Sequence, residues 1–269
     1  MKMAKVVPIY KSGDPVLMSN YRPVSILPLF SKILERLMYN RITSFINDNN
    51  LFYRYQFGFR ENHSTNMALI MLVDQILSAL DKGEVVIGVF LDLKKAFDTV
   101  DHEILLGKLY KYGIRGIALS WIKDYLHDRT QYVSFNYCDT NKRSITCGVP
   151  QGSILGPLFF LLYINDLSHV SDKLLPFIFA DDTNIFMKGK SVNNVIQCMN
   201  NELVQVIEWL NSNKLSLNIA KTHYMVFKTK QKKLDCTVPL VANGSKIEQV
   251  TSTKFIGVML DSKLCWDRI

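Results

Sequence analysis

The 269-residue chain has no closely spaced cysteines. Its five cysteines are odd in number and far apart, and none belongs to a CxxC or Cys/His cluster: Cys138, Cys147, Cys198, Cys236 and Cys265. This spacing argues against a disulfide framework and against a structural zinc site. We therefore expect reduced thiols, no disulfide-linked partner and an intracellular protein of the nucleus or the cytoplasm.

The chain also lacks a long apolar segment. Its longest strongly apolar run covers residues 157–164 and is closed by Asp166, whereas a transmembrane helix needs about 20 apolar residues. The first residues, Met-Lys-Met-Ala-Lys-Val-Val-Pro, do not contain the apolar core of a signal peptide. These two features predict no membrane partner.

What the sequence does have is an ample core and excess positive charge. Apolar residues make up 48% of the chain, and its formal net charge is +8. The first value suffices for a large folded core. The second suits a polyanionic partner, either nucleic acid or an anionic membrane surface. Charge alone does not decide whether the chain binds either of them.

Apolar periodicity predicts helices and strands that do not alternate strictly. Helical spacing covers 30–46, 66–80 after a cap at Ser64 or Thr65, 102–112, 117–127, 157–167 and 192–210 after a cap at Ser191. Strands are predicted at 84–93, 130–137, around 225–227 and at 255–260, with a hairpin at 177–187. No internal repeat or long linker interrupts them. The mixture indicates an α+β fold.

Three acidic residues stand in apolar surroundings. Asp92 lies near the end of the apolar run 84–93, whose continuous β-branched character predicts a strand buried on both faces. Asp181 and Asp182 follow Phe-Ile-Phe-Ala at the turn of the predicted hairpin. Ionised carboxylates are costly to bury without a cationic partner, and two adjacent ones also repel each other.

A divalent cation would remove both costs, and ligands that are all oxygen favour Mg²⁺ over zinc. A strand acid facing two hairpin acids could hold two Mg²⁺ ions about 4 Å apart. For an isolated Asp-Asp pair, ordinary turn acids are the commoner explanation. Asp92 reduces that preference without reversing it, so the decision depends on the neighbouring motifs.

Three motifs occur in a fixed order around these acids. They read Phe90-Leu-Asp-Leu-Lys-Lys-Ala-Phe-Asp-Thr-Val-Asp-His102, Cys147-Gly-Val-Pro-Gln-Gly-Ser-Ile-Leu-Gly-Pro157 and Phe179-Ala-Asp-Asp-Thr-Asn184. They resemble palm motifs A, B and C of reverse transcriptases, and within that family the non-LTR (LINE-like) retrotransposon branch.

Four further blocks agree with this resemblance. Asn20-Tyr-Arg-Pro-Val-Ser-Ile-Leu-Pro28 and Gln56-Phe-Gly-Phe-Arg60 resemble fingers motifs of the same branch. Trp209-Leu-Asn-Ser-Asn-Lys-Leu-Ser-Leu-Asn-Ile-Ala-Lys-Thr222 and Phe255-Ile-Gly-Val-Met-Leu-Asp261 resemble its later palm motifs. The seven blocks cover nearly the whole chain.

The resemblance implies a right-hand polymerase fold. Its fingers would be mainly 1–85 with part of 102–146, and its palm mainly 86–101 and 147–269. Full-length non-LTR elements also carry an upstream endonuclease and a helical thumb after the palm. Neither has a counterpart within these 269 residues, so we expect fingers and palm with the thumb missing.

The resemblance also assigns the metal site. It makes Asp92, Asp181 and Asp182 the catalytic acids and metal ligands, with the Leu93 carbonyl as an additional ligand. The expected cofactor is a pair of Mg²⁺ ions, with Mn²⁺ as a substitute. Lys221 matches the motif D lysine that protonates the departing pyrophosphate, and Lys214 is an adjacent competitor for that role.

Five residues match nucleotide-binding positions. Phe97 matches the steric gate that excludes a 2′-hydroxyl, although it could equally be a core phenylalanine. Gln151 and Gly152 match the motif B loop. Lys11 and Arg22 match fingers cations that meet the triphosphate, although any one surface lysine is more often simply solvated.

The implied activity is extension of a DNA primer by dNTPs on an RNA template. An RNA-dependent RNA polymerase would be expected to show Gly-Asp-Asp and a small residue at position 97, and a group II intron maturase fits the fingers blocks less well. The alternative of another class is a truncated, inactive remnant that only binds nucleic acid.

Overall fold

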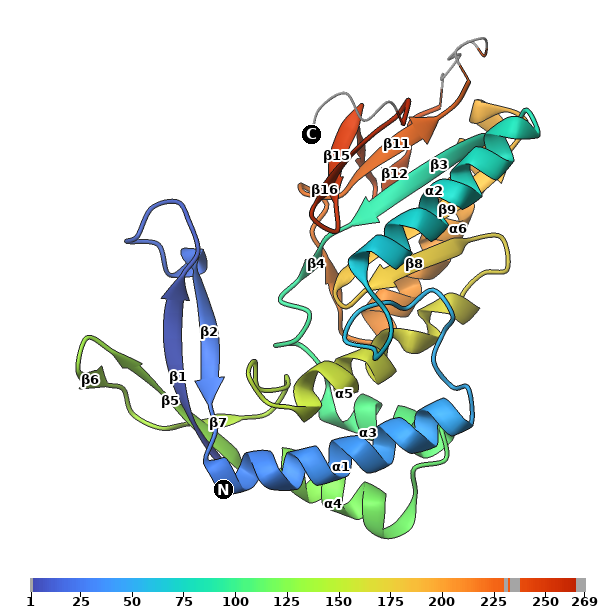
Figure 1. The fold of residues 1–269 in the computed structure, drawn as a ribbon. Helices are drawn as coiled ribbons and strands as arrows, with labels where there is room; N and C mark the ends of the chain where they lie inside the picture. Colours follow the sequence, from blue (N-terminus) through green and yellow to red (C-terminus); the bar gives the residue numbers. More distant parts are fainter. Residues whose placement is uncertain (1, 230–231, 233–237, 265–269) are drawn as a thin grey trace. The chain divides into compact units, whose positions relative to one another are not determined.

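The chain divides into two units, each built from two separate stretches of sequence (Figure 1). This computed structural model describes residues 2–229, 232 and 238–264. The first unit takes 1–52 and 97–164, and the second takes 53–96 and 165–269. Helices and strands are mixed in both units, which confirms the predicted α+β class.

The boundaries of these units differ from those predicted for fingers and palm. Residues 53–85, expected in the fingers, fold in the same unit as Asp92. Residues 147–164, expected in the palm, fold with the N-terminal strands. The names fingers and palm therefore stay predictions, and the two units are described separately.

The strands of the first unit form a mixed sheet around β1. Strand β1 (Met3–Tyr10) pairs antiparallel with β2 (Tyr21–Ile26) and parallel with β5 (Arg129–Phe135). Strand β5 also pairs with two short strands, β6 (Cys138–Asp139) and β7 (Arg143–Ile145). A 3₁₀ turn, η1 (Met18–Asn20), leads into β2.

Four helices complete the first unit. They are α1 (Leu29–Asp48), α3 (His102–Lys111), α4 (Gly116–Leu126) and α5 (Leu155–Ile164). Nine of the ten α5 residues are buried, as the apolar run predicts. Asp101 caps α3, because its carboxylate accepts from the Ile104 N–H at 3.0 Å.

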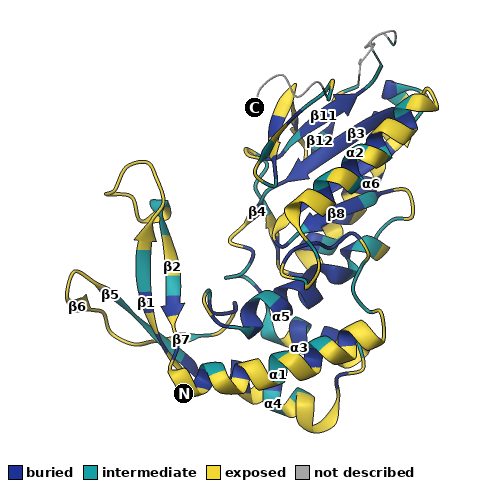
Figure 2. Ribbon diagram, viewed as in Figure 1, coloured by how far each residue is buried: buried dark blue, intermediate teal, exposed yellow. Residues whose placement is uncertain are grey.

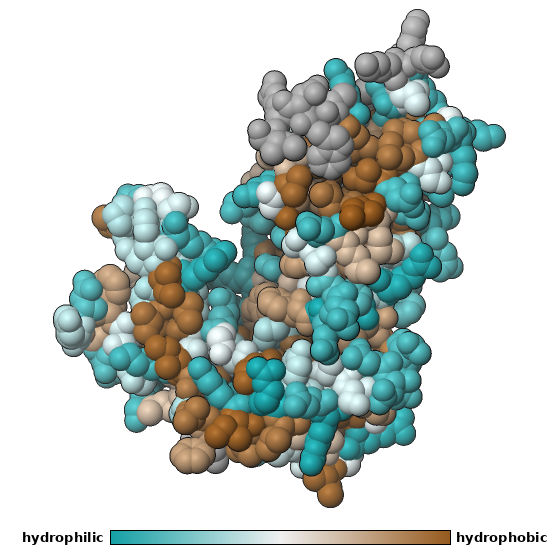
Figure 3. All heavy atoms as spheres, viewed as in Figure 1, coloured by the Kyte–Doolittle hydropathy of each residue, from teal (hydrophilic) through white to brown (hydrophobic). Residues whose placement is uncertain are grey.

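The apolar residues of α1 do not all face the core. The helix confirms the predicted spacing, but its buried residues are Ser31, Glu35, Ile42 and Ile46. The large apolar side chains of its first half are exposed, namely Leu29, Phe30, Ile33, Leu34 and Leu37. They contribute to the apolar surface visible along α1 in Figure 3. Glu35 occupies the core-facing position instead, because it binds other parts of this unit.

The second unit is built on a five-stranded sheet with the order β14-β11-β3-β9-β8. The central strand β3 (Val85–Leu91) is buried along its whole length (Figure 2), as predicted from its unbroken apolar sequence. It pairs antiparallel with β9 (Asp182–Gly189) and β11 (His223–Phe227). The edges are β8 (Leu175–Phe179) and the short β14 (Glu248–Gln249).

Two helices pack on this sheet. Helix α2 (Thr65–Asp81) packs on the cluster that includes Val86 and Phe90, and α6 (Val192–Ser212) contacts β3 and β9. The Ser64 hydroxyl caps α2 by accepting from the Met67 N–H. Ser191 is the N-cap residue of α6, as predicted, although its side chain makes no capping hydrogen bond.

Short elements fill the remainder of the second unit. They are η2 (Asn165–His169), β4 (Leu93–Lys94), β10 (Ser216–Leu217), β12 (Val241–Ala242), β13 (Ser245–Lys246), β15 (Ser252–Phe255) and β16 (Val258–Asp261). Cys138, Cys147 and Cys198 are free thiols, while Cys236 and Cys265 lie outside the described residues. In the part of the chain described, each helix is too short or too polar to cross a bilayer.

Candidate active site

The sheet of the second unit sets Asp92 opposite Asp182. The last residue pair between β3 and β9 is Leu91 with Thr183. One residue further along each strand stand the two acids. Residues directly opposite each other in an antiparallel pair have Cα atoms roughly 4.5–5.5 Å apart and point to the same face. The two carboxylates are therefore cross-strand neighbours at one end of the sheet.

Asp181 joins them from the tight turn between β8 and β9. Phe179 pairs with Asp182, so only Ala180 and Asp181 make the connection. Ala180 has φ of +57°, a left-handed conformation that is unfavourable for a residue with a Cβ. Local strain of this kind persists where surrounding contacts hold it, and it is frequent at functional sites.

The electrostatics of this cluster fit a cation site. Burial raises the pKa of the Asp182 carboxyl, and the charges of Asp181 and Asp92 raise this pKa further. Within the described residues, none of the three carboxylates forms an ion pair. Carboxylate oxygens are the ligands that Mg²⁺ prefers. Because these three carboxylates repel one another and have no basic partner among the described residues, a bound cation would stabilise them.

The three carboxylates do not converge on a single point. Among the residues described, no group of three or more His, Cys, Asp or Glu side chains is gathered closely enough to hold an ion. Asp92 and Asp182 face each other across the ladder, and Asp181 and Asp182 are both exposed. Ligation of one ion by all three carboxylates would thus require side-chain movement, which the exposure of Asp181 and Asp182 permits.

Asp92 is held by the turn that follows β10. The Asn218 N–H donates to the Asp92 carbonyl at 2.8 Å, and its side-chain amide donates to Asp92 Oδ2 at 2.7 Å. The Asp92 N–H in turn donates to the Thr222 hydroxyl at 3.3 Å. Asn218 and Thr222 both belong to a predicted palm block, but neither was expected to have a role of its own.

The segment 55–58 holds the acidic hairpin from its other edge. Phe57 donates its N–H to the Ile178 carbonyl, and Ile178 donates its N–H to the Tyr55 carbonyl. The buried Gln56 side chain uses Oε1 to accept the N–H groups of Gly58, at 3.0 Å, and Ala180, at 3.3 Å. The block predicted to belong to the fingers therefore supports the turn that carries Asp181.

Lys221 and Leu93 lie near Asp92 in the same unit. Lys221 is exposed in the turn 218–222, where its N–H donates to the Asn218 carbonyl at 3.1 Å. Leu93 pairs with Leu217 across β4 and β10. Since Asp92 directs its carbonyl to β10, ladder alternation directs the Leu93 carbonyl away from β10.

Lys11 and Arg22 lie in the first unit, at one end of the β1–β2 hairpin. Tyr10 pairs with Tyr21, and the Lys11 N–H donates to the Asn20 carbonyl just beyond that pair. Both basic side chains are exposed. The hairpin thus brings together the two predicted triphosphate-binding cations, which are eleven positions apart in the sequence.

The loop with Gln151 and Gly152 is bound to the same hairpin. Ser25 of β2 donates its N–H to the Gln151 carbonyl at 2.6 Å. Gly152 has φ of +118°, and a Cβ there would lie 2.5 Å from the Ser25 carbonyl oxygen. The Gln151 amide donates to Asp98 Oδ1 at 2.8 Å. Glycine is required at 152 because the two backbones approach so closely.

Phe97 lies against this loop. Its carbonyl accepts the Val149 N–H at 2.9 Å, and its half-buried ring stacks on Phe160 with centroids 4.5 Å apart. The ring therefore has one face in the core and keeps some exposure. This position accommodates both predicted alternatives, a steric gate and a core phenylalanine.

Glu35 fixes the other end of the loop. Its fully buried carboxylate accepts from the Ile154 N–H at 2.6 Å, the Leu155 N–H at 3.4 Å and the Tyr125 hydroxyl at 3.1 Å. A negative charge at the start of α5 is favoured by the helix dipole. The isolated Glu in the α1 stripe gave no indication of this function.

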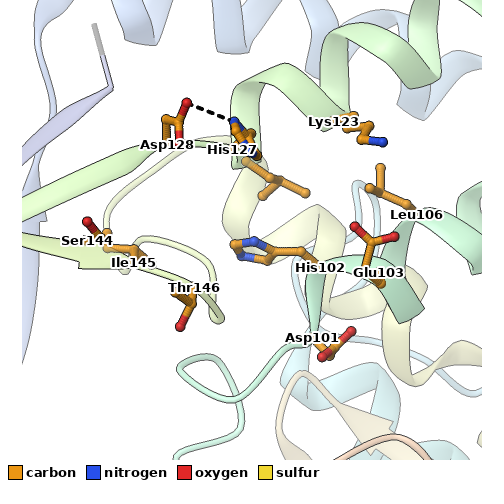
Figure 4. Close-up of a pocket in the computed structure, with 11 residues that line it drawn as sticks. Asp101, His102, Glu103, Leu106, Lys123, His127, Asp128, Ser144, Ile145 and Thr146 are labelled. Carbon is orange, nitrogen blue, oxygen red and sulfur yellow. Dashed lines mark ion pairs between the residues drawn. The ribbon is translucent and has the colours of Figure 1, made fainter.

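A separate cavity of about 300 Å³ opens in the first unit (Figure 4). His102, Glu103 and Lys123 are among the residues that line it, and His127 and Asp128 form an ion pair at its rim, with N and O 3.0 Å apart. His102 Nε2 lies 2.8 Å from the Gly148 carbonyl oxygen. None of the residues predicted to bind nucleotide lines this cavity.

Comparison with known proteins identifies the family. The family described as "Reverse transcriptase (RNA-dependent DNA polymerase)" matches residues 9–260. The RNA-directed DNA polymerase from mobile element jockey of Drosophila melanogaster is 32% identical over 99% of this chain and 30% of its own length. The corresponding jockey protein of Drosophila funebris is 31% identical over 98% of this chain and 29% of its own length.

The chain thus spans about a third of the length of these curated relatives.

Solved structures agree on the fold. Apo telomerase from Candida tropicalis superposes with a TM-score of 0.63 at 12% identity, over 99% of this chain and 48% of that one. The RNA-dependent RNA polymerase of a human picobirnavirus gives 0.51 at 14%, over 82% of this chain and 40% of that one. The chain belongs to the reverse transcriptase family, in its non-LTR retrotransposon branch.

Proposed function

We propose that the chain is the fingers and palm of an RNA-directed DNA polymerase that extends a DNA primer on an RNA template. The observation that carries this proposal is the acidic cluster of the second unit. Asp92 and Asp182 are opposite each other on adjacent strands, Asp181 adjoins them, and burial raises the pKa of Asp182. Membership of the reverse transcriptase family supports the same proposal.

The reaction is a phosphoryl transfer. The primer 3′-hydroxyl loses its proton to solvent and its oxygen bonds to the α-phosphorus of a dNTP. The bond between that phosphorus and the oxygen bridging to the β-phosphorus breaks, and pyrophosphate leaves. Bound divalent cations, proposed to be two Mg²⁺ held by Asp92, Asp181, Asp182 and the Leu93 carbonyl, would stabilise charge at the attacking and leaving oxygens.

The remaining roles belong to side chains. Lys221 donates a proton to the departing pyrophosphate, for which its exposed position near Asp92 is suitable. Arg22 and Lys11 bind the triphosphate as exposed cations at one hairpin end. Phe97 excludes the 2′-hydroxyl of a ribonucleotide, while Gln151 and Gly152 position the nucleotide. Positive charge across the chain supports binding of the template and primer backbones.

The test compares templates and nucleotides. Purified chain is given a DNA primer on an RNA template of adenosines, or the same primer on a DNA template, with dTTP or UTP and Mg²⁺. The proposal predicts dTTP incorporation on RNA and little UTP incorporation. UTP incorporation at an equal rate would indicate an RNA polymerase, and RNA binding without any incorporation would indicate a remnant that only binds nucleic acid.

A further inference from the structure

Asn218 is the residue directly across from Asp92 in the second unit. Strands β4 and β10 pair Leu93 with Leu217, and the next residues along are Asp92 and Asn218. The Asn218 N–H donates to the Asp92 carbonyl at 2.8 Å and so extends that ladder by one bond. The Asp92 backbone is thereby hydrogen-bonded along the strand edge that faces away from Asp182.

The side chain of Asn218 makes a second bond to the same residue. Its Nδ2 donates to Asp92 Oδ2 at 2.7 Å, a short distance for a bond between an amide and a carboxylate. Rotation about the last torsion of an aspartate is broadly permitted, so a free carboxylate samples many orientations. The hydrogen bond to Oδ2 selects one orientation of the Asp92 carboxylate. The other oxygen, Oδ1, accepts no hydrogen bond from any described residue and can bind a cation.

Thr222 closes the arrangement around Asp92. It is buried, accepts the Asp92 N–H at 3.3 Å and donates its hydroxyl proton to the Asn218 carbonyl at 2.9 Å. The same carbonyl accepts the Lys221 N–H at 3.1 Å. The turn 218–222 therefore holds Asp92 by backbone and side-chain hydrogen bonds, and Lys221 belongs to the same turn.

We propose that Asn218 is a positioning residue that orients the Asp92 carboxylate for cation binding and links it to the turn of Lys221. This inference rests on the proposed function. An amide suits the task because it donates a hydrogen bond without adding charge. A lysine or arginine at this position would pair with Asp92 and reduce its negative charge at the cation site.

Groups that orient metal ligands typically change metal affinity or activity by about 10–100-fold when they are replaced. Asn218→Ala removes the amide, and Asn218→Leu keeps its size without a donor. Mn²⁺ affinity, measured by electron paramagnetic resonance without primer or nucleotide, should fall in both variants by about 10–100-fold. Asn213→Ala is the matched control, because the Asn213 amide donates to the Trp209 carbonyl at 2.7 Å. It should bind Mn²⁺ as the wild type does.

Activity provides the second readout. Both Asn218 variants should need about 10–100-fold more Mg²⁺ for half-maximal incorporation, while the rate at saturating Mg²⁺ falls less. Wild-type Mn²⁺ affinity and Mg²⁺ requirement in both variants would overturn the assignment. A wild type that binds Mn²⁺ but incorporates no nucleotide would refute the proposed function alone, since the Mn²⁺ comparison still tests Asn218.

A measurement on the folded wild type covers the case in which the variants unfold. The side-chain amide protons of Asn218, assigned by NMR, should be displaced by their bond to the carboxylate. Asp92→Ala should return them to the range of a free asparagine amide. Resonances of Asn218 that do not differ between wild type and Asp92→Ala would overturn the proposal, because they would show that the bond is absent.

Discussion

Asp92 and Asp182 are the next residues beyond the last pair of β3 and β9, so two carboxylates face each other where the ladder ends. Neither acid forms an ion pair with any residue in the described part of the chain. The sheet thereby concentrates negative charge that destabilises the fold until a cation or a proton reduces it.

The first prediction concerns the stability of the metal-free protein. Because the pKa of Asp182 in the folded protein is raised above its ordinary value of 3.8, the unfolded chain binds fewer protons in the window between the two values. The free energy of unfolding therefore falls as pH rises through this window. Asp182→Asn should be more stable than wild type above it, with no such gain below about pH 3.8.

Urea denaturation in EDTA across pH measures this effect. Asp74→Asn, an exposed acid on α2, is the control and should follow wild type. Added Mg²⁺ should stabilise wild type more than Asp182→Asn. A variant that is less stable than wild type at neutral pH in EDTA would contradict the account of the acidic cluster.

The second prediction concerns Gly58, which lies against the acidic hairpin. A Cβ at this position would be 2.3 Å from the backbone nitrogen of Ala180. Gly58→Ala should therefore displace the turn, destabilise the chain by about 1–3 kcal/mol and reduce incorporation. Gly107→Ala places the same methyl on α3, where nothing lies within 4 Å, and should stabilise by about 0.5–1 kcal/mol. Equal thermal midpoints for wild type and Gly58→Ala would argue against the close contact.

The third prediction concerns Phe97 and sugar selection. Phe97→Ala should increase the incorporation of UTP relative to dTTP, because the ring no longer blocks a 2′-hydroxyl. Phe97→Tyr keeps the bulk of the ring and should retain the selectivity. Steady-state kinetics with both nucleotides separate the alternatives. If Phe97→Ala loses stability but excludes ribonucleotides as before, Phe97 is a core residue stacked on Phe160 and not a gate.

The fourth prediction concerns the buried Glu35. Glu35→Ala leaves the Ile154 N–H and the Tyr125 hydroxyl without their acceptor, which should cost roughly 2–4 kcal/mol of stability. Glu208→Ala, at an exposed position on α6, should change stability by less than about 0.5 kcal/mol. The urea midpoint measures both. A loss of stability in Glu35→Ala well below this range would contradict the prediction and would show that water accepts the hydrogen bonds in place of the carboxylate.

Local pattern was enough to predict most helices and the central strand. The unbroken apolar run of 84–93 and the turn at Asp181 appear as β3 and as the β8–β9 connection. The β1–β2 hairpin was not predicted, although its two strands are close in sequence. The pairing of β1 with β5 was not predicted because it joins residues more than a hundred positions apart. Such long-range pairing leaves little trace in local periodicity.

The sites show the same limit. The acids were singled out because carboxylates in apolar runs are unusual, and their roles are predictions from the resemblance to the family motifs. Asn218, Gln56 and Glu35 were not singled out, since each acts through a bond to a residue distant in sequence. Residues 53–58 were expected with the fingers, yet Gln56 binds the turn of the acidic hairpin. Only the folded contacts reveal that connection.

The most direct test of the central claim is Mg²⁺-dependent dTTP incorporation on an RNA template with a DNA primer, by wild type, Asp182→Asn and Asp74→Asn. The account predicts incorporation by wild type and Asp74→Asn, and none above background by Asp182→Asn. Incorporation by Asp182→Asn at the wild-type rate would contradict the assignment of the acidic cluster. RNA binding by all three proteins without any incorporation would contradict the claim that this chain is a polymerase.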